Sequence, residues 1–139
     1  MNRINNHLWS TWTSLFFILP ALTAWMFGEI VIAAIILLVT IFSLSYHIKK
    51  PRGIDWWWRK DKTKSQRILQ GLDTISSLVL LYYVILDLIR SWPSLGSIML
   101  GIIGVLGLII LFMDNKYYEA LHGIWHIIAS FILVAVFFV

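Results

Sequence analysis

Two histidines near the end of the sequence, His122 and His126, are four residues apart in the segment His-Gly-Ile-Trp-His. In a helix this spacing places both imidazole rings on one face, where they could bind the same metal ion. His47 would complete a set of three histidine ligands and leave a fourth position for water, as in catalytic zinc sites. Histidines that only form hydrogen bonds between helices would also explain this spacing, so both interpretations stay open at this point.

Two further polar residues, Ser43 and Asp73, lie in strongly apolar segments. Ser43 precedes His47 by four residues and is therefore expected on the same helix face, one turn away. Asp73 follows Arg67 by six residues, so we expect it about 9 Å further into its helix than that cation. Asp73 could orient a metal-bound water or take its proton, and Ser43 could donate a hydrogen bond to a developing oxyanion.

The segments that carry these residues are apolar enough to be membrane spans. The chain has 139 residues, of which 60% are hydrophobic and 13% are charged, whereas soluble domains average about 25% charged residues. Lipid offers no partners for backbone polar groups, so spans of about 20 apolar residues should be helices. The sequence therefore predicts an all-α, polytopic transmembrane bundle that forms a single domain (residues 1–139). Five spans are predicted, at about residues 8–27, 30–48, 66–90, 94–113 and 117–139.

The absence of cysteine and the short connections narrow this prediction. A chain without cysteine cannot form disulfides, thiolate metal sites or cysteine nucleophiles. The first two spans are separated only by Gly28 and Glu29, which predicts a tight reversal and antiparallel neighbours. The fourth span carries small residues at spacings of three and four, which allow another helix to approach closely. These residues, Ser97, Gly101, Gly104 and Gly107, are compatible with packing inside the bundle or with a homodimer.

Most of the positive charge falls in one loop, residues 49–67, which holds eight of the 11 lysines and arginines. By the positive-inside rule this loop and the N-terminus should be cytoplasmic. The loop also contains Trp56, Trp57 and Trp58, and tryptophan favours the lipid headgroup zone. We therefore expect anionic lipid headgroups, and not nucleic acid, as the partner of this loop.

The polar residues of the second, third and last spans resemble those of the CREST superfamily of membrane hydrolases. That superfamily includes alkaline ceramidases, the adiponectin and progestin receptors, and haemolysin III-like proteins. The matching segments are Ser43-Leu44-Ser45-Tyr46-His47, Leu72-Asp73 and His122-x-x-x-His126.

The resemblance implies a zinc-dependent intramembrane hydrolase that cleaves an amide or ester bond of a membrane lipid. It implies Zn²⁺ bound by His47, His122 and His126, with Asp73 and Ser43 as catalytic residues. Family members usually have seven helices, whereas five spans are predicted here, so a homodimer through the fourth span is a hypothesis for completing the bundle.

Two other functions fit the same residues. A non-enzymatic lipid sensor or immunity-type membrane protein would use zinc to hold its helices together and would show no turnover. A haem b protein would bind iron through His47 and one histidine of the last span. The haem interpretation leaves the other histidine, Ser43 and Asp73 without a role.

Overall fold

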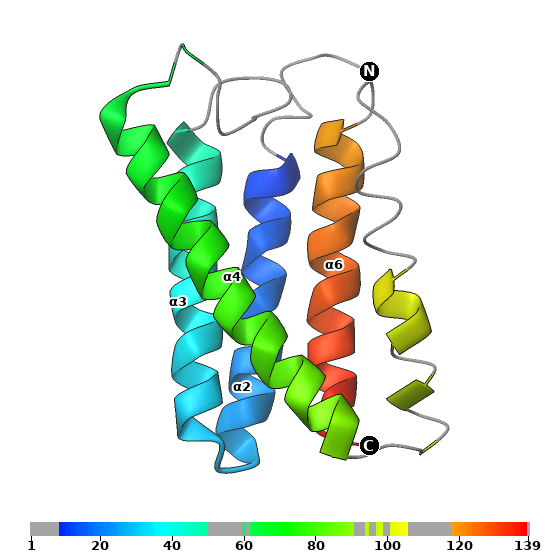
Figure 1. Ribbon diagram of the computed structural model, residues 1–139. Helices are drawn as coiled ribbons and strands as arrows, with labels where there is room; N and C mark the ends of the chain where they lie inside the picture. The colour runs from blue at the N-terminus through cyan, green and yellow to red at the C-terminus, as the bar shows by residue number, and fades with distance from the viewer. Residues whose placement is uncertain are drawn as a thin grey trace.

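The computed structural model describes residues 9–49, 60, 62–90, 94, 97–98, 101–105 and 118–138, and these residues form helices joined by turns. The helices are η1 (Ser14–Phe17), α2 (Ile18–Met26), α3 (Ile30–Lys49), α4 (Lys64–Arg90) and α6 (Tyr118–Val136). Residues 9–13, directly before η1, are also helical, as are residues 101–105. In Figure 1 the N-terminal helix (residues 9–26), α3 and α6 run side by side, and α4 crosses them obliquely. The all-α prediction is therefore confirmed for the described residues.

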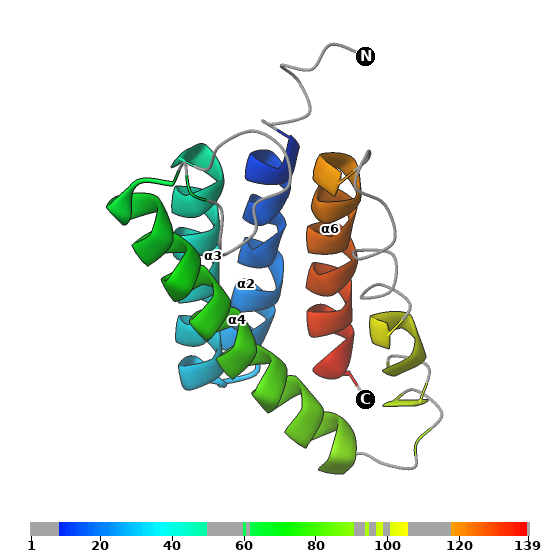
Figure 2. The same cartoon turned by 45° about the horizontal axis from the view of Figure 1, so that its top comes forward.

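The N-terminal helix lies between α3 and α6, as both Figure 1 and Figure 2 show. Its parts η1 and α2 pack against α3 on one side and against α6 on the other. Pro20 explains the single 3-10 turn at η1, because its ring collides with the carbonyl of Phe16 and it has no N–H to donate. The helix therefore tightens just before Pro20 and then continues as α2.

The chain reverses between α2 and α3 at Gly28, which has a φ of +80°. The amides of Gly28 and Glu29 donate hydrogen bonds to the carbonyls of Trp25 (3.0 Å) and Ala24 (2.9 Å), which closes the end of α2. A residue with a Cβ is disfavoured in this left-handed conformation, so glycine suits the position. The predicted tight reversal is confirmed.

The start of α4 is fixed by a capping box. The Thr63 amide donates to Oε1 of Gln66 (2.8 Å), and the Gln66 amide donates to Oγ1 of Thr63 (3.3 Å). The side-chain amide of Gln66 also donates to the carbonyl of Lys49, the last residue of α3. These bonds start α4 at Lys64, two residues before the predicted span, and hold it beside the end of α3.

The other predicted spans agree with the helices to differing degrees. The predicted span 30–48 matches α3, and α6 (Tyr118–Val136) lies within the predicted span 117–139. In the predicted span 94–113, residues 97–98 and 101–105 are helical, and residues 106–113 lie outside the described residues. Residues 50–59, with the three tryptophans, lie outside them as well. Two helices, Ile30–Lys49 and Lys64–Asp87, are long and apolar enough to cross a membrane, and Ala120–Val136 is a shorter apolar helix.

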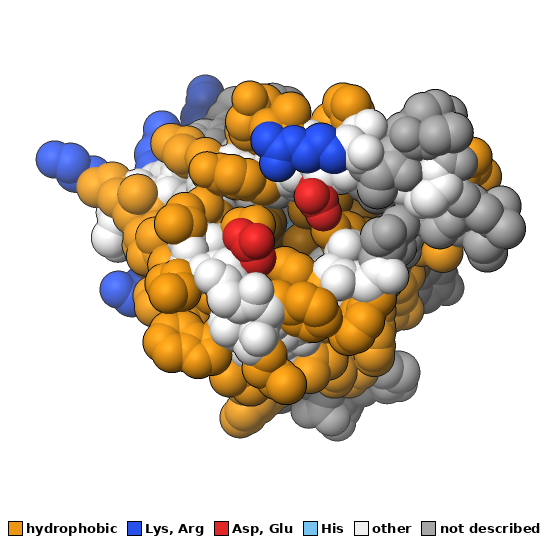
Figure 3. All heavy atoms as spheres, turned by 90° about the horizontal axis from the view of Figure 1, so that it is seen from below, with side chains coloured by type: hydrophobic (Ala, Val, Ile, Leu, Met, Phe, Trp, Pro, Cys, Tyr) orange, Lys and Arg blue, Asp and Glu red, His pale blue; other side chains and the backbone are white. Residues whose placement is uncertain are grey.

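The described helices place many apolar side chains outside and several polar ones inside. Met26, Trp25 and Ile89 are among the most exposed large side chains, whereas Ser10 and Ser130 are fully buried. Hydrophobic side chains also cover most of the end that contains the Gly28 turn (Figure 3). At this end the core is apolar and includes Ala24, Ala33, Leu80 and Leu133. The buried polar groups next to the histidines are described below.

Candidate metal centre

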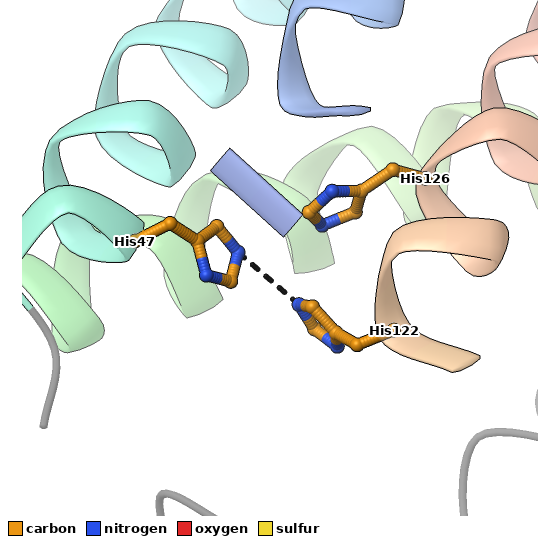
Figure 4. A group of neighbouring side chains, drawn as sticks. All are labelled: His47, His122 and His126. Atoms are coloured by element: carbon orange, nitrogen blue, oxygen red, sulfur yellow. Dashed lines mark hydrogen bonds between the residues drawn. The ribbon is translucent and has the colours of Figure 1, made fainter. Parts of the chain in front are cut away.

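The structure brings the three predicted ligands together. His47 comes from the last turn of α3, and His122 and His126 come from successive turns of α6 (Figure 4). One ring nitrogen from each lies within 4.8 Å of the others. His47 is 1% exposed and His126 is 5% exposed, while His122 is half-buried. These three histidines could bind a metal ion.

The distance between two of the rings fits a small tetrahedral ion. Nε2 of His47 and Nε2 of His122 are 3.1 Å apart. Two nitrogen ligands of tetrahedral zinc, each about 2.0–2.1 Å from the ion, would be about 3.3–3.4 Å apart. The two atoms would therefore need to separate by only a few tenths of an ångström. At this distance one of the two atoms can donate a proton to the other, and a bound metal ion would replace that proton.

The three imidazole rings meet edge to face. Their centroids are between 4.6 and 5.1 Å apart, and the angles between their planes are between 61° and 68°. Imidazole lone pairs lie in the ring planes, so rings inclined in this way can aim nitrogen atoms at one point. Parallel stacking would not allow this. The arrangement of the rings therefore supports binding of one metal ion by all three histidines.

Two hydroxyl groups of the N-terminal helix contact the Nδ1 atom of the His126 ring. Nδ1 of His126 lies 3.2 Å from Oγ1 of Thr13 and 3.3 Å from Oγ of Ser14. Both residues are buried. Neither residue was predicted from the sequence to belong to the site. The available signal was the spacing of Ser10, Thr13 and Ser14, which places three hydroxyls on one face of an apolar helix.

Ser43 belongs to the same group of hydroxyls. Its Oγ is buried and lies 3.3 Å from Oγ of Ser14. Ser43 is thus connected to His126 through Ser14, on the Nδ1 side of the ring. Its predicted role as a donor to an oxyanion stays a prediction.

Asp73 lies half-buried on α4, which packs against α3. Its backbone carbonyl accepts a hydrogen bond of 3.0 Å from Oγ of Ser76. Among the described residues, the group of potential ligand atoms within 4.8 Å of one another consists of the three histidines and does not include Asp73. Its predicted action on a metal-bound water therefore stays a prediction.

Gly123 explains how the N-terminal helix comes so close to α6. A Cβ at this position would overlap the indole ring of Trp9 and would lie 3.1 Å from Oγ1 of Thr13. Glycine is unfavourable inside a helix by roughly 1 kcal/mol relative to alanine. The close approach is the physical reason for glycine here, and it brings Thr13 within reach of His126.

Comparisons of this chain with family models, with curated proteins and with solved structures found no match. What the protein does must therefore be inferred from its own side chains. The expected resemblance to the CREST superfamily stays a prediction, which depends on the order of five residues in the sequence: Ser43, His47, Asp73, His122 and His126.

Proposed function

We propose that this protein is a zinc-dependent membrane hydrolase that cleaves an amide or ester bond of a membrane lipid. The observation that carries the proposal is the cluster of His47, His122 and His126, in which one ring nitrogen of each histidine lies within 4.8 Å of the others. Three histidines with a fourth position open for water are a ligand set of catalytic zinc. The exposed apolar helices and the residue order shared with the CREST superfamily support the membrane and hydrolase parts of the proposal.

The outward-facing side chains support placement in a membrane. Large exposed apolar surfaces are rare on soluble monomers, and such surface on helices of spanning length suits contact with lipid. Exposed cations at Lys49, Lys64 and Arg67 lie at one end of α3 and α4. The predicted loop 49–67 thus includes the last residue of α3 and the first turn of α4. We propose a multi-pass protein with this end, and the segment 49–67, on the cytoplasmic side against anionic headgroups.

The position of the histidines along the helices favours a lipid amide or ester as substrate. His47 is two residues from Lys49 at the end of α3, and His122 is four residues after the start of α6. In the proposed orientation the cluster thus lies near the cytoplasmic boundary of the hydrocarbon. The ester and amide linkages of membrane lipids lie at this same boundary, between the headgroup and the acyl chains.

His47, His122 and His126 would hold a zinc ion, which when bound would supply a water that ionises near neutral pH. Asp73 would take a proton from the water that adds to the carbonyl carbon of the lipid. Asp73 would then give this proton to the leaving amine or alkoxide as the C–N or C–O bond breaks. The products are a fatty acid and an amine or alcohol. Ser43 would either stabilise the oxyanion or help to hold His126 through Ser14, whose hydroxyl its own hydroxyl contacts.

The geometry of the cluster disfavours the haem alternative. Nitrogen ligands on opposite faces of a haem iron would be about 4 Å apart, which is twice a typical metal–nitrogen bond. The two Nε2 atoms of His47 and His122 are only 3.1 Å apart. The ring of His126 also contacts both of these rings, at centroid distances of 5.1 and 4.6 Å, and would occupy space that the macrocycle needs.

The orientation can be tested with single cysteines, because the native chain has none. Lys64→Cys and Glu29→Cys replace exposed residues at opposite ends of the membrane helices. We expect a membrane-impermeant maleimide to label Lys64→Cys only in inside-out vesicles and Glu29→Cys only in right-side-out vesicles. Labelling of both positions from the same side would contradict the proposed topology.

The function is tested by elemental analysis of detergent-purified protein beside a His47→Ala variant, followed by hydrolysis assays on lipid amides and esters in vesicles. We expect about one zinc per wild-type chain and none in the variant. Fatty acid release should stop when a chelator removes the metal and return when zinc is added. Zinc without hydrolysis of any of these lipids would instead favour the structural-zinc sensor, and absence of any metal would contradict the site.

A further inference from the structure

We infer that Thr13 and Ser14 are positioning residues for His126: they hold its imidazole with the proton on Nδ1, so that Nε2 presents its lone pair to the metal. The inference rests on the proposed metal site. It goes beyond that site because it assigns a role to the N-terminal helix, which contributes none of the three histidines.

Each of the two hydroxyl protons is already directed to a backbone carbonyl. Ser14 donates to the carbonyl of Ser10 at 2.9 Å. Thr13 donates to the carbonyl of Trp9 at 3.0 Å or that of Ser10 at 3.1 Å. A hydroxyl has one proton to donate and two lone pairs to accept with. With both protons directed to carbonyls, both oxygens accept toward His126, and Nδ1–H is the shared donor.

The opposite tautomer would be unsuitable for metal binding. With the proton on Nε2, the lone pair of His126 would lie on Nδ1 and face the two hydroxyls, and one hydroxyl would have to leave its carbonyl to donate to it. Nε2 would then have no lone pair for a metal. Histidine ligands generally donate their second ring N–H to a neighbouring group, which fixes the tautomer and the ring orientation. Here Thr13 and Ser14 are the neighbouring groups.

The surroundings keep these two acceptors in place. Thr13 is 1% exposed and Ser14 is fully buried, so water does not compete for Nδ1–H. Ser14 also contacts Ser43 on α3, and Thr13 is brought close to α6 by the absence of a side chain at Gly123. The hydroxyls thus connect the N-terminal helix to both helices that carry the histidines.

The first test observes the tautomer directly in metal-free protein labelled with ¹⁵N-histidine, at about pH 8.5, where an ordinary histidine is neutral. The His126 signals, identified by their loss in His126→Asn, should show a protonated Nδ1 and an unprotonated Nε2. The double variant Thr13→Val/Ser14→Ala should lose this preference. A proton on Nε2 in the wild type, or an unchanged spectrum in the double variant, would overturn the inference. The result does not depend on zinc binding or turnover, so failure of the proposed function would be recognised separately.

The second test measures zinc affinity by chelator competition. The double variant Thr13→Val/Ser14→Ala should bind zinc about 10–100-fold more weakly, as is usual when a partner of a histidine ligand is lost. The exchange variant Thr13→Ser/Ser14→Thr keeps both hydroxyls and should bind zinc within a few-fold of wild type.

The matched control is Thr40→Val, since Thr40 is a buried threonine whose hydroxyl donates to the carbonyl of Ile36 in its own helix (2.8 Å). It should leave zinc affinity unchanged. An equal loss of affinity in Thr40→Val, or in the exchange variant, would show that packing and not hydrogen bonding matters, and would overturn the inference.

Discussion

Replacing His126 with alanine is expected to abolish zinc binding and lipid hydrolysis together. The variant leaves two histidines, one on α3 and one on α6, and removes the ring that Thr13 and Ser14 orient. Loss of a group that hydrogen-bonds to a histidine ligand costs about 10–100-fold in metal affinity. Loss of the ligand itself should therefore cost more than about 100-fold. Elemental analysis of the purified variant and its initial rate of fatty acid release measure the two effects.

His7→Ala is the control for this experiment, because His7 is the one histidine of the sequence outside the proposed ligand set. It should retain about one zinc per chain and wild-type hydrolysis. A His126→Ala protein that keeps its zinc and its activity would show that the histidine cluster is not the site.

Asp73→Asn is expected to separate binding from catalysis. The asparagine amide has nearly the size of the carboxylate but cannot take a proton from water, and removing a general base typically lowers turnover by about 10²–10⁴-fold. Asp73 is not among the clustered ligand atoms, so the variant should keep its zinc. Steady-state kcat and elemental analysis of the same preparation test both statements.

Asp87→Asn provides a matched control on the same helix. Asp87 lies 14 residues after Asp73 on α4, which is about 21 Å along the helix axis. We expect the control to hydrolyse lipid at the wild-type rate. If Asp73→Asn also retained full activity, its assigned role as the base would be wrong.

The helices could be predicted from sequence because apolar runs of about 20 residues favour helices over other secondary structures. The run before Lys49 predicted α3 to within one residue, and the Gly28-Glu29 pair predicted the reversal before it. The clustering of His47 with His122 and His126 is one of two interpretations of the sequence, in which the spacing of four fixes one pair and the helix ends place His47 at a similar depth. Each of these predictions depends on local periodicity or on the position of a residue along its helix.

The contacts of Thr13, Ser14 and Gly123 could not be predicted in this way. Serine and threonine in helices commonly bond to their own backbone, so a hydroxyl in an apolar run does not by itself indicate a partner. Their roles appear only once the N-terminal helix is placed between α3 and α6. That placement depends on packing between segments more than 100 residues apart in sequence, as in the Thr13 to His126 contact, and periodicity carries no information on it.

His47 lies far from the other two histidines in the sequence, so the ribosome makes the three ligands at different times. His47 precedes His122 by 75 residues, so the ribosome completes α3 and α4 before it makes the other two histidines. A nascent chain that ends before α6 holds only one of the three proposed ligands. In the proposed protein, metal loading would therefore follow the synthesis of α6, and the bound ion would join the last described helix to one made much earlier in translation.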